Sequence, residues 1–453
     1  EGYNSAINNY QIAETGDYYL GVGAYADNGT GTYFVSANRL PANSPGYSSQ
    51  DGYGQINIQM AFEQHLSISL APVAELGGRQ WTLDNINAPE VWVQSGEFLG
   101  ATGFGTVVAV IDTGVDLDHE EFAGRIVQGY DFVDNDLEAD DGNGHGTHVA
   151  GTIAGANDGN EVTGVAFSAQ IMPIRVLNNS GSGYTSDIVS GIRYAAENNA
   201  DVINLSLGGG GYSQSMADAI EYASNLGSVV VMAAGNSGGS SPEYPAAHAR
   251  YNGLAVGAVE QAGNMASFSN LSGDVEIDYV SAPGVDVYSS IPGDRYASYN
   301  GTSMATPHVA GAAALLRGYD PSLSAESIED LLTGTASNSF ASFSSTAQDF
   351  LEVGEYDSLT NYAEYITPEN IHSFNAGDLP ETLIGRLSSD SQLTCVSDFG
   401  LSTSSEDFSW ERLTNNLFAL EIGPSDESHS LISELLDSNH FDYFEIDQTW
   451  TIA

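Results

Sequence analysis

Three short segments carry residue types that together can cleave a covalent bond. Asp112 follows an apolar run in AVIDTGVD, His145 lies between two glycines in GHGTHVAG, and Ser303 precedes an Ala- and Gly-rich stretch in GTSMATPHVAG. A serine hydroxyl is a weak nucleophile near neutral pH and needs an adjacent base, which a histidine titrating in that range can provide. Taken singly, the aspartate could be a helix cap or turn residue and the serine an ordinary N-cap.

A fourth segment, VVVMAAGNSGG, places Asn236 just after an apolar run. An asparagine beside glycine is often a turn residue, but its amide can also donate a hydrogen bond to an anionic oxygen. In the order Asp, His, Ser, the three motifs resemble the subtilase family, which implies a serine endopeptidase working through an acyl-enzyme intermediate. The resemblance implies that Asp112 orients His145, that His145 is the base for Ser303, and that Asn236 and the Ser303 N–H bind the oxyanion. Asn236 also disfavours the sedolisins, which use acidic residues in the base and oxyanion positions.

Two glycine-rich segments, NSGSGY and SLGGGG, resemble the family strands that pair with an extended peptide substrate. Binding through backbone hydrogen bonds predicts broad selectivity, with side-chain pockets setting the preferences. The residues assigned to substrate binding in this way are Ser182, Gly183, Tyr184, Ser206, Leu207 and Gly208. Glu243, in SPEYPA, falls where the base of the S1 pocket is often Gly, so we expect a preference for Arg or Lys before the cleaved bond. The alternative is that Glu243 points to solvent.

Two acidic loops are candidates for a structural calcium ion, because clustered carboxylate and carbonyl oxygens suit a hard cation. The first, DFVDNDLEADDGNGHG, resembles the calcium loop of thermitase-like subtilases, although a solvated run of charge is the alternative in so acidic a chain. Its implied ligands are the side chains of Asp131, Asp134, Asp136 and Asp140 and the carbonyl of Glu138. The second, GANDGNEVTG, resembles the high-affinity site of the family. Its implied ligands are Asp158, the carbonyls of Ala156, Asn160 and Val162, and Glu121 in the place usually held by Asp. No organic cofactor is expected.

Apolar, β-branched runs alternate with helical stretches through the middle of the chain. The runs cover residues 107–111, 171–176, 202–207, 229–233 and 254–259, and the helical stretches include residues 186–198 and 215–226. This alternation predicts buried parallel strands with helical crossovers, an α/β fold of three layers around a mostly parallel sheet. The resemblance to subtilases implies the same architecture. Functional residues of open α/β sheets lie at the carboxyl ends of the strands, where we place Asp112.

We expect five segments along the chain. Residues 1–39 form a β-hairpin fragment around Asn28-Gly29 and resemble the end of a pre-peptidase C-terminal domain. Residues 40–75 are a linker, residues 76–337 the catalytic domain, and residues 338–378 a connecting region. Residues 379–453 form a small α+β domain with strands at 383–387, 417–422 and 441–450 and a helix at 427–437. This last domain resembles the propeptide domains that chaperone and inhibit subtilisin-like enzymes, although such domains normally precede the catalytic unit.

The composition narrows the range of partners. Sixty acidic residues against ten basic ones, all of them Arg, give a formal net charge of −50. Such a surface disfavours nucleic acid and anionic membranes and suits saline surroundings. Cys395 is the single cysteine, so no intrachain disulfide can form. No apolar stretch approaches the ~18 residues of a membrane span. We expect a secreted, monomeric enzyme acting on polypeptides, with a silent subtilase-like scaffold or protein-binding module as the alternative.

Overall fold

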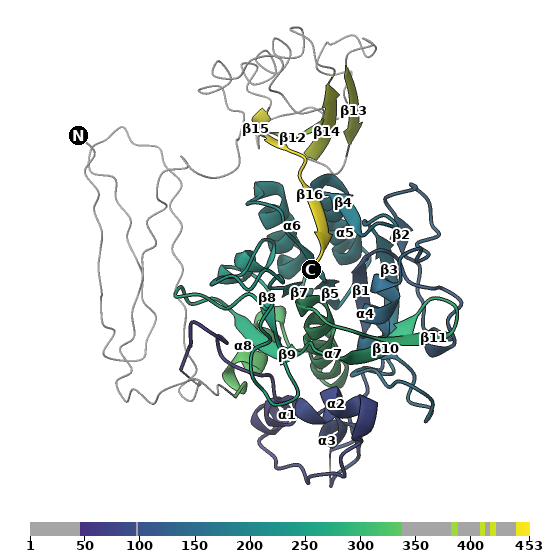
Figure 1. The fold of residues 1–453 in the computed structure, drawn as a ribbon, viewed down its shortest axis with the longest axis vertical. Helices are drawn as coiled ribbons and strands as arrows, with labels where there is room; N and C mark the ends of the chain where they lie inside the picture. The colour runs from purple at the N-terminus through teal and green to yellow at the C-terminus, as the bar shows by residue number, and fades with distance from the viewer. Residues whose placement is uncertain (1–45, 97, 338–381, 388–407, 413–416, 423–440) are drawn as a thin grey trace, which may run out of the picture.

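The computed structural model describes residues 46–96, 98–337, 382–387, 408–412, 417–422 and 441–453. Its centre is a seven-stranded parallel sheet in the order β2-β3-β1-β5-β7-β8-β9 (Figure 1). The strands are β1 (Val107–Asp112), β2 (Tyr130–Asp131), β3 (Gln170–Arg175), β5 (Val202–Leu205), β7 (Val229–Ala233), β8 (Leu254–Val259) and β9 (Tyr279–Pro283). The expected α/β fold with a parallel central sheet is confirmed.

Both faces of this sheet are buried, which explains the continuous apolar runs. In β1, Val108 and Val110 belong to one buried cluster, while Ala109 and Ile111 belong to another on the opposite face. The first cluster includes residues of α1 (Ile58–Leu66), α4 (His145–Ala154), α7 (Thr302–Tyr319) and α8 (Ala325–Gly334). The second includes residues of α5 (Thr185–Glu197) and α6 (Gln214–Asn225). Strands covered by helices on both sides cannot alternate between polar and apolar residues.

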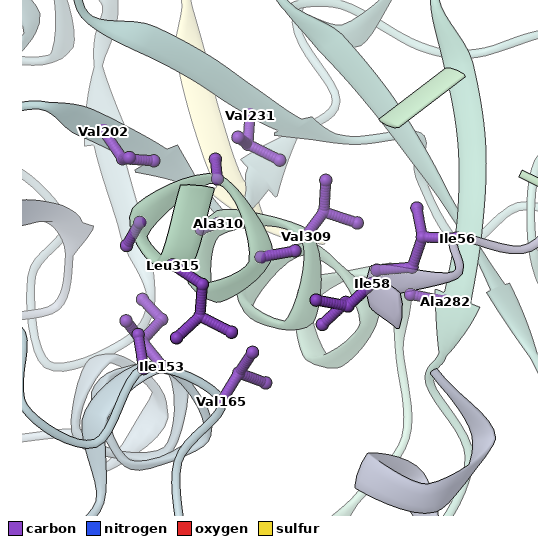
Figure 2. Close-up of a cluster of buried hydrophobic side chains, with 14 of the residues drawn as sticks. Ile56, Ile58, Ile153, Val165, Val202, Val231, Ala282, Val309, Ala310 and Leu315 are labelled. Atoms are coloured by element: carbon purple, nitrogen blue, oxygen red, sulfur yellow. The ribbon is translucent and has the colours of Figure 1, made fainter. Parts of the chain in front are cut away.

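The described part of the expected linker is instead part of the core. Ile56 and Ile58 are buried and lie in the same cluster as Val309 of the central helix α7 (Figure 2). Helix α1 begins after Asn57, whose side chain accepts a hydrogen bond from the N–H of Met60. The segment reads as a linker because it is rich in polar and small residues, but its few apolar residues are placed to bury one helix face. The expectation of a linker over residues 40–75 is therefore wrong for residues 46–70, whereas residues 71–75 form no helix or strand.

The remaining elements of the catalytic part are short. They are α2 (Trp81–Asn85), α3 (Pro89–Trp92), the hairpin strands β10 (Val287–Ile291) and β11 (Arg295–Tyr299), and the 3₁₀ turns Gly78–Gln80, Glu120–Phe122 and Ala246–Arg250. No helix in the described ranges is both long and apolar enough to cross a lipid bilayer.

A second, antiparallel sheet follows near the end of the chain. Its strand order is β13-β14-β12-β15, formed by β12 (Thr382–Leu387), β13 (Phe408–Arg412), β14 (Leu417–Ile422) and β15 (Phe441–Ile446). The single strand expected over residues 441–450 is wrong, because the chain leaves this sheet after Ile446. Residues Thr449–Ile452 form a separate strand, β16, between β4 (Ser182–Tyr184) and β6 (Leu207–Gly208) (Figure 1). The hairpin expected in residues 1–39, the connecting region 338–378 and the helix expected at 427–437 lie outside the described residues.

Candidate active site

Asp112 and His145 meet at the carboxyl edge of the central sheet. Asp112 is the last residue of β1 and His145 the first of α4, and Asp112 Oδ1 lies 2.8 Å from His145 Nδ1. Asp112 is fully buried, and its Oδ1 also accepts the N–H of Thr113 at 2.7 Å. A carboxylate can only accept, so the proton of the His145–Asp112 hydrogen bond belongs to Nδ1. The other imidazole nitrogen, Nε2, is therefore free to accept a proton.

The start of α4 is fixed by Asp141. Its Oδ1 accepts hydrogen bonds from the N–H groups of Asn143 and Gly144 and from the hydroxyl of Thr113, at 2.8–2.9 Å. Its Oδ2 accepts from the N–H and the hydroxyl of Thr147. These bonds join the loop after β1 to the helix that begins at His145. Asp141 was not predicted as a site residue, although an acidic residue just ahead of a helix is a recognisable capping signal.

The two glycines around His145 are each required by the backbone. Gly144 has a φ of 111°, in a region that side chains rarely adopt. A Cβ atom on Gly146 would lie 2.0 Å from the carbonyl oxygen of Gly114 and 3.1 Å from Cβ of Asp112. The close approach that these glycines allow brings the imidazole to the end of β1.

Ser303 is the second residue of α7 and is fully buried. Pro307 has no N–H, so it cannot form the helical hydrogen bond to the carbonyl of Ser303. The hydroxyl of Ser206 replaces that donor at 2.9 Å, and it in turn accepts from Asn204. The Ser303 hydroxyl donates to the carbonyl of Ser206 at 3.0 Å. The nucleophile candidate is thus tied to the segment that precedes β6.

Two hydrogen-bond donors converge near Ser303. Asn236 Oδ1 accepts the N–H of Thr302 at 2.9 Å and its hydroxyl at 3.1 Å, which fixes the direction of the amide and leaves Nδ2 on its other side. A Cβ on Gly301 would lie 3.2 Å from that Nδ2 and 3.2 Å from the carbonyl oxygen of Ala453. The N–H of Ser303 donates to this same carbonyl oxygen at 3.1 Å. A carbonyl oxygen therefore accepts the N–H of Ser303 on the side of the helix start where the Asn236 amide lies.

The six residues expected to bind substrate surround a peptide strand. Strand β16 pairs antiparallel with β4 on one side and with β6 on the other. Trp450 lies opposite Gly183, and Ile452 lies opposite Leu207. The carbonyl of Ser206 accepts the N–H of Ala453 at 3.4 Å. The structure thus brings the NSGSGY and SLGGGG segments together as the two strands that flank β16.

Glu243 lies beside the two residues that flank Asn236. Its Oε1 accepts the hydroxyl of Ser237 at 2.6 Å, and its Oε2 would be 2.8 Å from a Cβ on Gly235. Both residues flank Asn236 in the sequence. The carboxylate is therefore beside the segment that carries Asn236 and is partly exposed.

The first candidate calcium loop is held by an arginine. Arg175 Nη1 contacts Asp131 Oδ2 and Asp134 Oδ2, each at 2.6 Å. Asp136 accepts the N–H of Glu138 at 2.8 Å, and Asp140 accepts the N–H of Leu117 at 3.4 Å. The guanidinium supplies the positive charge that this loop needs, so two of the implied ligands already have a cationic partner.

In the second candidate loop, the two acidic side chains also have protein partners. Glu121 accepts the N–H of Ala156 at 2.6 Å and the hydroxyl of Tyr296 at 2.8 Å, and burial raises its pKa. The Asp158 carboxylate is bonded to the N–H and side-chain amide of Asn160. Within the described ranges, no group of three or more His, Cys, Asp or Glu side chains could hold a metal ion as arranged. In both loops acidic side chains are bonded to protein groups, and the calcium ligand sets, including the carbonyls of Glu138 and Val162, stay predictions.

Comparison with known proteins identifies the relatives of this chain. The family described as the Subtilase family matches residues 103–360. Subtilisin Savinase of Lederbergia lenta is 46% identical over 258 residues, which cover 57% of this chain and 91% of that protein. Thermitase of Thermoactinomyces vulgaris is 44% identical over 263 residues, covering 57% and 90%. The crystal structure of a cold adapted subtilisin-like serine proteinase has a TM-score of 0.51 at 40% identity, covering 60% of this chain and 96% of that one. With this sheet and these motifs, the chain belongs to the subtilase family and is a subtilisin-like serine endopeptidase.

Proposed function

We propose that Ser303 is the nucleophile of this peptidase, with His145 as its base, Asp112 as the residue that orients the imidazole, and Asn236 as an oxyanion donor. The observation that carries the proposal is the acyl oxygen of Ala453, which accepts the N–H of Ser303 and lies beside the amide of Asn236. A donor that meets an oxygen at this position gains strength as negative charge develops there.

In the proposed reaction, rotation of the Ser303 hydroxyl away from the Ser206 carbonyl directs its proton to Nε2 of His145. The oxygen attacks the carbonyl carbon of the substrate, and His145 takes the proton as the C–O bond forms. The oxyanion of the tetrahedral intermediate is held by the Ser303 N–H and the Asn236 amide. His145 then gives its proton to the leaving nitrogen as the C–N bond breaks. Water repeats the attack on the resulting ester and releases the acid.

Substrate is proposed to bind as an extended strand between β4 and β6. The support is β16, which makes main-chain hydrogen-bond pairs with both strands. Main-chain recognition gives broad selectivity. Glu243 is proposed to favour a basic residue before the cleaved bond, because its carboxylate lies beside the Asn236 segment.

Secretion and a structural calcium ion complete the proposal. The acidic surface, with a net charge of −50, suits a protein that works in saline surroundings. Detection of the enzyme in the culture medium of its source cells would check secretion. Calcium would act on stability alone, so it enters no step of the reaction.

A fluorophosphonate probe, which reacts with activated serines, tests the nucleophile directly. We expect the full chain to be labelled at one residue when the reaction is carried to completion, and Ser303→Ala to remain unlabelled. Ser327→Ala, in α8, is the matched control and should label like the parent. Labelling that persists in Ser303→Ala would contradict the assignment, as would absence of labelling in folded parent protein.

A further inference from the structure

A polar side chain interrupts a strand of the central sheet that is buried throughout. Asn204 is fully buried in β5, and its neighbours in register are Val110 of β1 and Val231 of β7. Because side chains alternate along a strand, Asn204 points to the same face as Val202, the face covered by α7 (Figure 2). An amide in these surroundings costs stability unless its hydrogen-bonding groups are paired. The partners of Asn204 should therefore show why this position is polar.

One half of the Asn204 amide is paired within the described part of the chain. Nδ2 donates to the hydroxyl oxygen of Ser206 at 2.9 Å, whereas Oδ1 has no hydrogen-bond partner there. The Ser206 hydroxyl has a single proton, which it donates to the carbonyl oxygen of Ser303 at 2.9 Å. The group that Asn204 presents to Ser206 must therefore be its N–H. This bond directs the O–H of Ser206 toward Ser303.

The carbonyl of Ser303 needs this donor because of Pro307. In a regular helix each carbonyl accepts the N–H of the residue four positions later. Pro307 has no N–H, and the ring of a proline crowds the carbonyl four residues before it. Ser303 is fully buried, and a buried carbonyl that lacks a donor is costly. The Ser206 hydroxyl supplies the donor from outside the helix.

Ser206 and Ser303 are joined by two reciprocal hydrogen bonds. The side chain of each donates to the carbonyl of the other, at 2.9 and 3.0 Å. In the proposed reaction, the Ser303 hydroxyl leaves the Ser206 carbonyl in order to reach His145. The bond from the Ser206 hydroxyl to the Ser303 carbonyl does not involve that moving group. It can therefore hold the main chain of the nucleophile while the side chain turns.

We propose that Asn204 is a positioning residue for catalysis, which acts through Ser206 to fix the carbonyl of Ser303 in place of the helical hydrogen bond that Pro307 removes. The inference rests on the proposed role of Ser303 as the nucleophile and adds the hydrogen-bond chain that holds it. Small errors in the placement of a reacting group lower rates steeply. This chain should therefore affect the rate of attack by Ser303 more than the stability of the protein.

The limiting rate of fluorophosphonate labelling at saturating probe measures how well Ser303 attacks in the full chain. We expect Ser206→Ala to lower this rate about tenfold, the equivalent of one hydrogen bond, and to leave the half-saturating probe concentration unchanged. Ser228→Ala is the matched control, because the buried Ser228 hydroxyl donates to the carbonyl of Ala200 at 2.7 Å, ahead of β5. The control should label like the parent. An unchanged limiting rate in Ser206→Ala would overturn the proposal.

Pro307→Ala gives a sharper test, because it restores the N–H four residues after Ser303. The helical hydrogen bond can then form, and the Ser206 hydroxyl becomes dispensable. In this background, we expect Ser206→Ala to lower the limiting rate by less than about twofold, against about tenfold when Pro307 is present. An equal loss in both backgrounds would show that Ser206 acts in some other way.

Asn204→Val distinguishes a positioning role from a structural one. The substitution removes the bond to Ser206 together with the unpaired Oδ1, and it places an apolar side chain between two valines. We expect the limiting rate of labelling to fall about fivefold, while the thermal midpoint stays equal to that of the parent or rises. A structural residue would give the opposite result, a lower midpoint with an unchanged rate, and that result would refute the inference.

Thermal unfolding separates this inference from the proposed chemistry. Ser303→Ala removes the hydroxyl but keeps the carbonyl at this position, so the stability effects of Ser206→Ala and Pro307→Ala can be measured in that background. We expect them to be non-additive, with the loss from Ser206→Ala largely absent once Pro307→Ala is present. Non-additivity would support the hydrogen-bond chain even if the parent is not labelled, which would refute the nucleophile alone. Additive losses would refute the chain even if Ser303 is labelled.

Discussion

At the scale of single residues, Glu243 gives the most direct test of selectivity. We expect peptides with Arg before the cleaved bond to be cleaved about fivefold better than matched Leu peptides, because a partly exposed ion pair is worth about 1 kcal/mol. Glu243→Gln keeps the size of the side chain and the acceptor for Ser237, and it should remove the gain. The measurement is kcat/KM for Arg, Phe and Leu peptides. No preference for Arg in the parent would show that Glu243 serves another purpose.

The residues that could be predicted from the sequence are those that lie inside a motif. Asp112, His145, Ser303 and Asn236 each stand in a short segment with distinctive neighbours. The structure bonds Asp112 to His145, and it bonds Asn236 to Thr302, which precedes Ser303. Thr185 was not predicted, because a threonine at a helix start has an ordinary structural explanation. Its hydroxyl accepts a hydrogen bond from the indole of Trp450, which lies 265 positions away in the chain.

At the scale of elements, the negative charge of the loop formed by residues 131–140 can be neutralised by the Arg175 guanidinium, by a calcium ion, or by both. Arg175 forms ion pairs with Asp131 and Asp134. Among the described residues, it forms none with Asp136. If calcium also binds this loop, it should raise the free energy of unfolding by about 2.7 kcal/mol at 100 times its Kd. Asp136→Asn should reduce that gain while leaving the Arg175 ion pairs intact.

Thermal unfolding in excess calcium and in chelator measures this gain. Asp118→Asn, which removes an exposed acid outside the loop, is the control for the loss of one negative charge. Identical midpoints in calcium and chelator would show that Arg175 alone neutralises the loop.

How well an element could be predicted depends on how many of its residues are apolar. Five of the seven central strands were located within a residue or two, because burial on both faces leaves a strong apolar run, whereas β2 and β9 were not predicted. Helix α1 was missed because its buried face consists of a few residues in a polar segment. The break between β15 and β16 could not be predicted from the sequence. It occurs where Asp447 and Gln448 form hydrogen bonds with Ser186 and Thr185, which are far away in the chain.

At the scale of the whole molecule, buried acids and buried histidines limit stability from opposite sides. Burial, together with Asp278, Asp330 and Glu326, raises the pKa of Glu329 to about 8. Burial first, and then neighbouring acids, raises the pKa of Asp278 to about 7. A raised carboxyl pKa gives stability that is complete below the ordinary value and is lost as the pH rises through the folded value.

Buried histidines change the stability with pH in the opposite direction. Burial lowers the pKa of His148 to about 3 and those of His248 and His308 to about 4. Stability from these groups is lost as the pH falls below about 6.5, the value for an unfolded histidine. Together, the buried carboxyls and the buried histidines predict that the protein is most stable slightly below pH 7.

We therefore expect the thermal midpoint to fall between pH 6 and pH 9, and Glu329→Gln to recover part of that loss. At pH 4 the variant and the parent should unfold at nearly the same temperature, because Glu329 is then largely protonated in both the folded and the unfolded protein. Calorimetry from pH 4 to pH 9, on Ser303→Ala background to prevent self-digestion, measures both curves. A variant that is equally stabilised at pH 4 and pH 9 would contradict the titration of Glu329.

The contact that fills the cleft lay beyond the reach of sequence patterns. The resemblance of residues 379–453 to inhibitory propeptide domains predicted a relation to the enzyme, but the position of Trp450 depends on pairing between segments far apart in the chain. No local periodicity encodes such pairing.

Strand β16 also changes how the protein meets other copies of itself. With β16 in place, the edges of β4 and β6 are hydrogen-bonded within the chain. If β16 were displaced, the edges of β4 and β6 that it covers would be unpaired, and exposed edges are templates for pairing with other extended chains. The freed enzyme should then be prone to self-association at the same surface that recognises its substrates. The position of β16 would then control both the tendency of the protein to associate with itself and its activity.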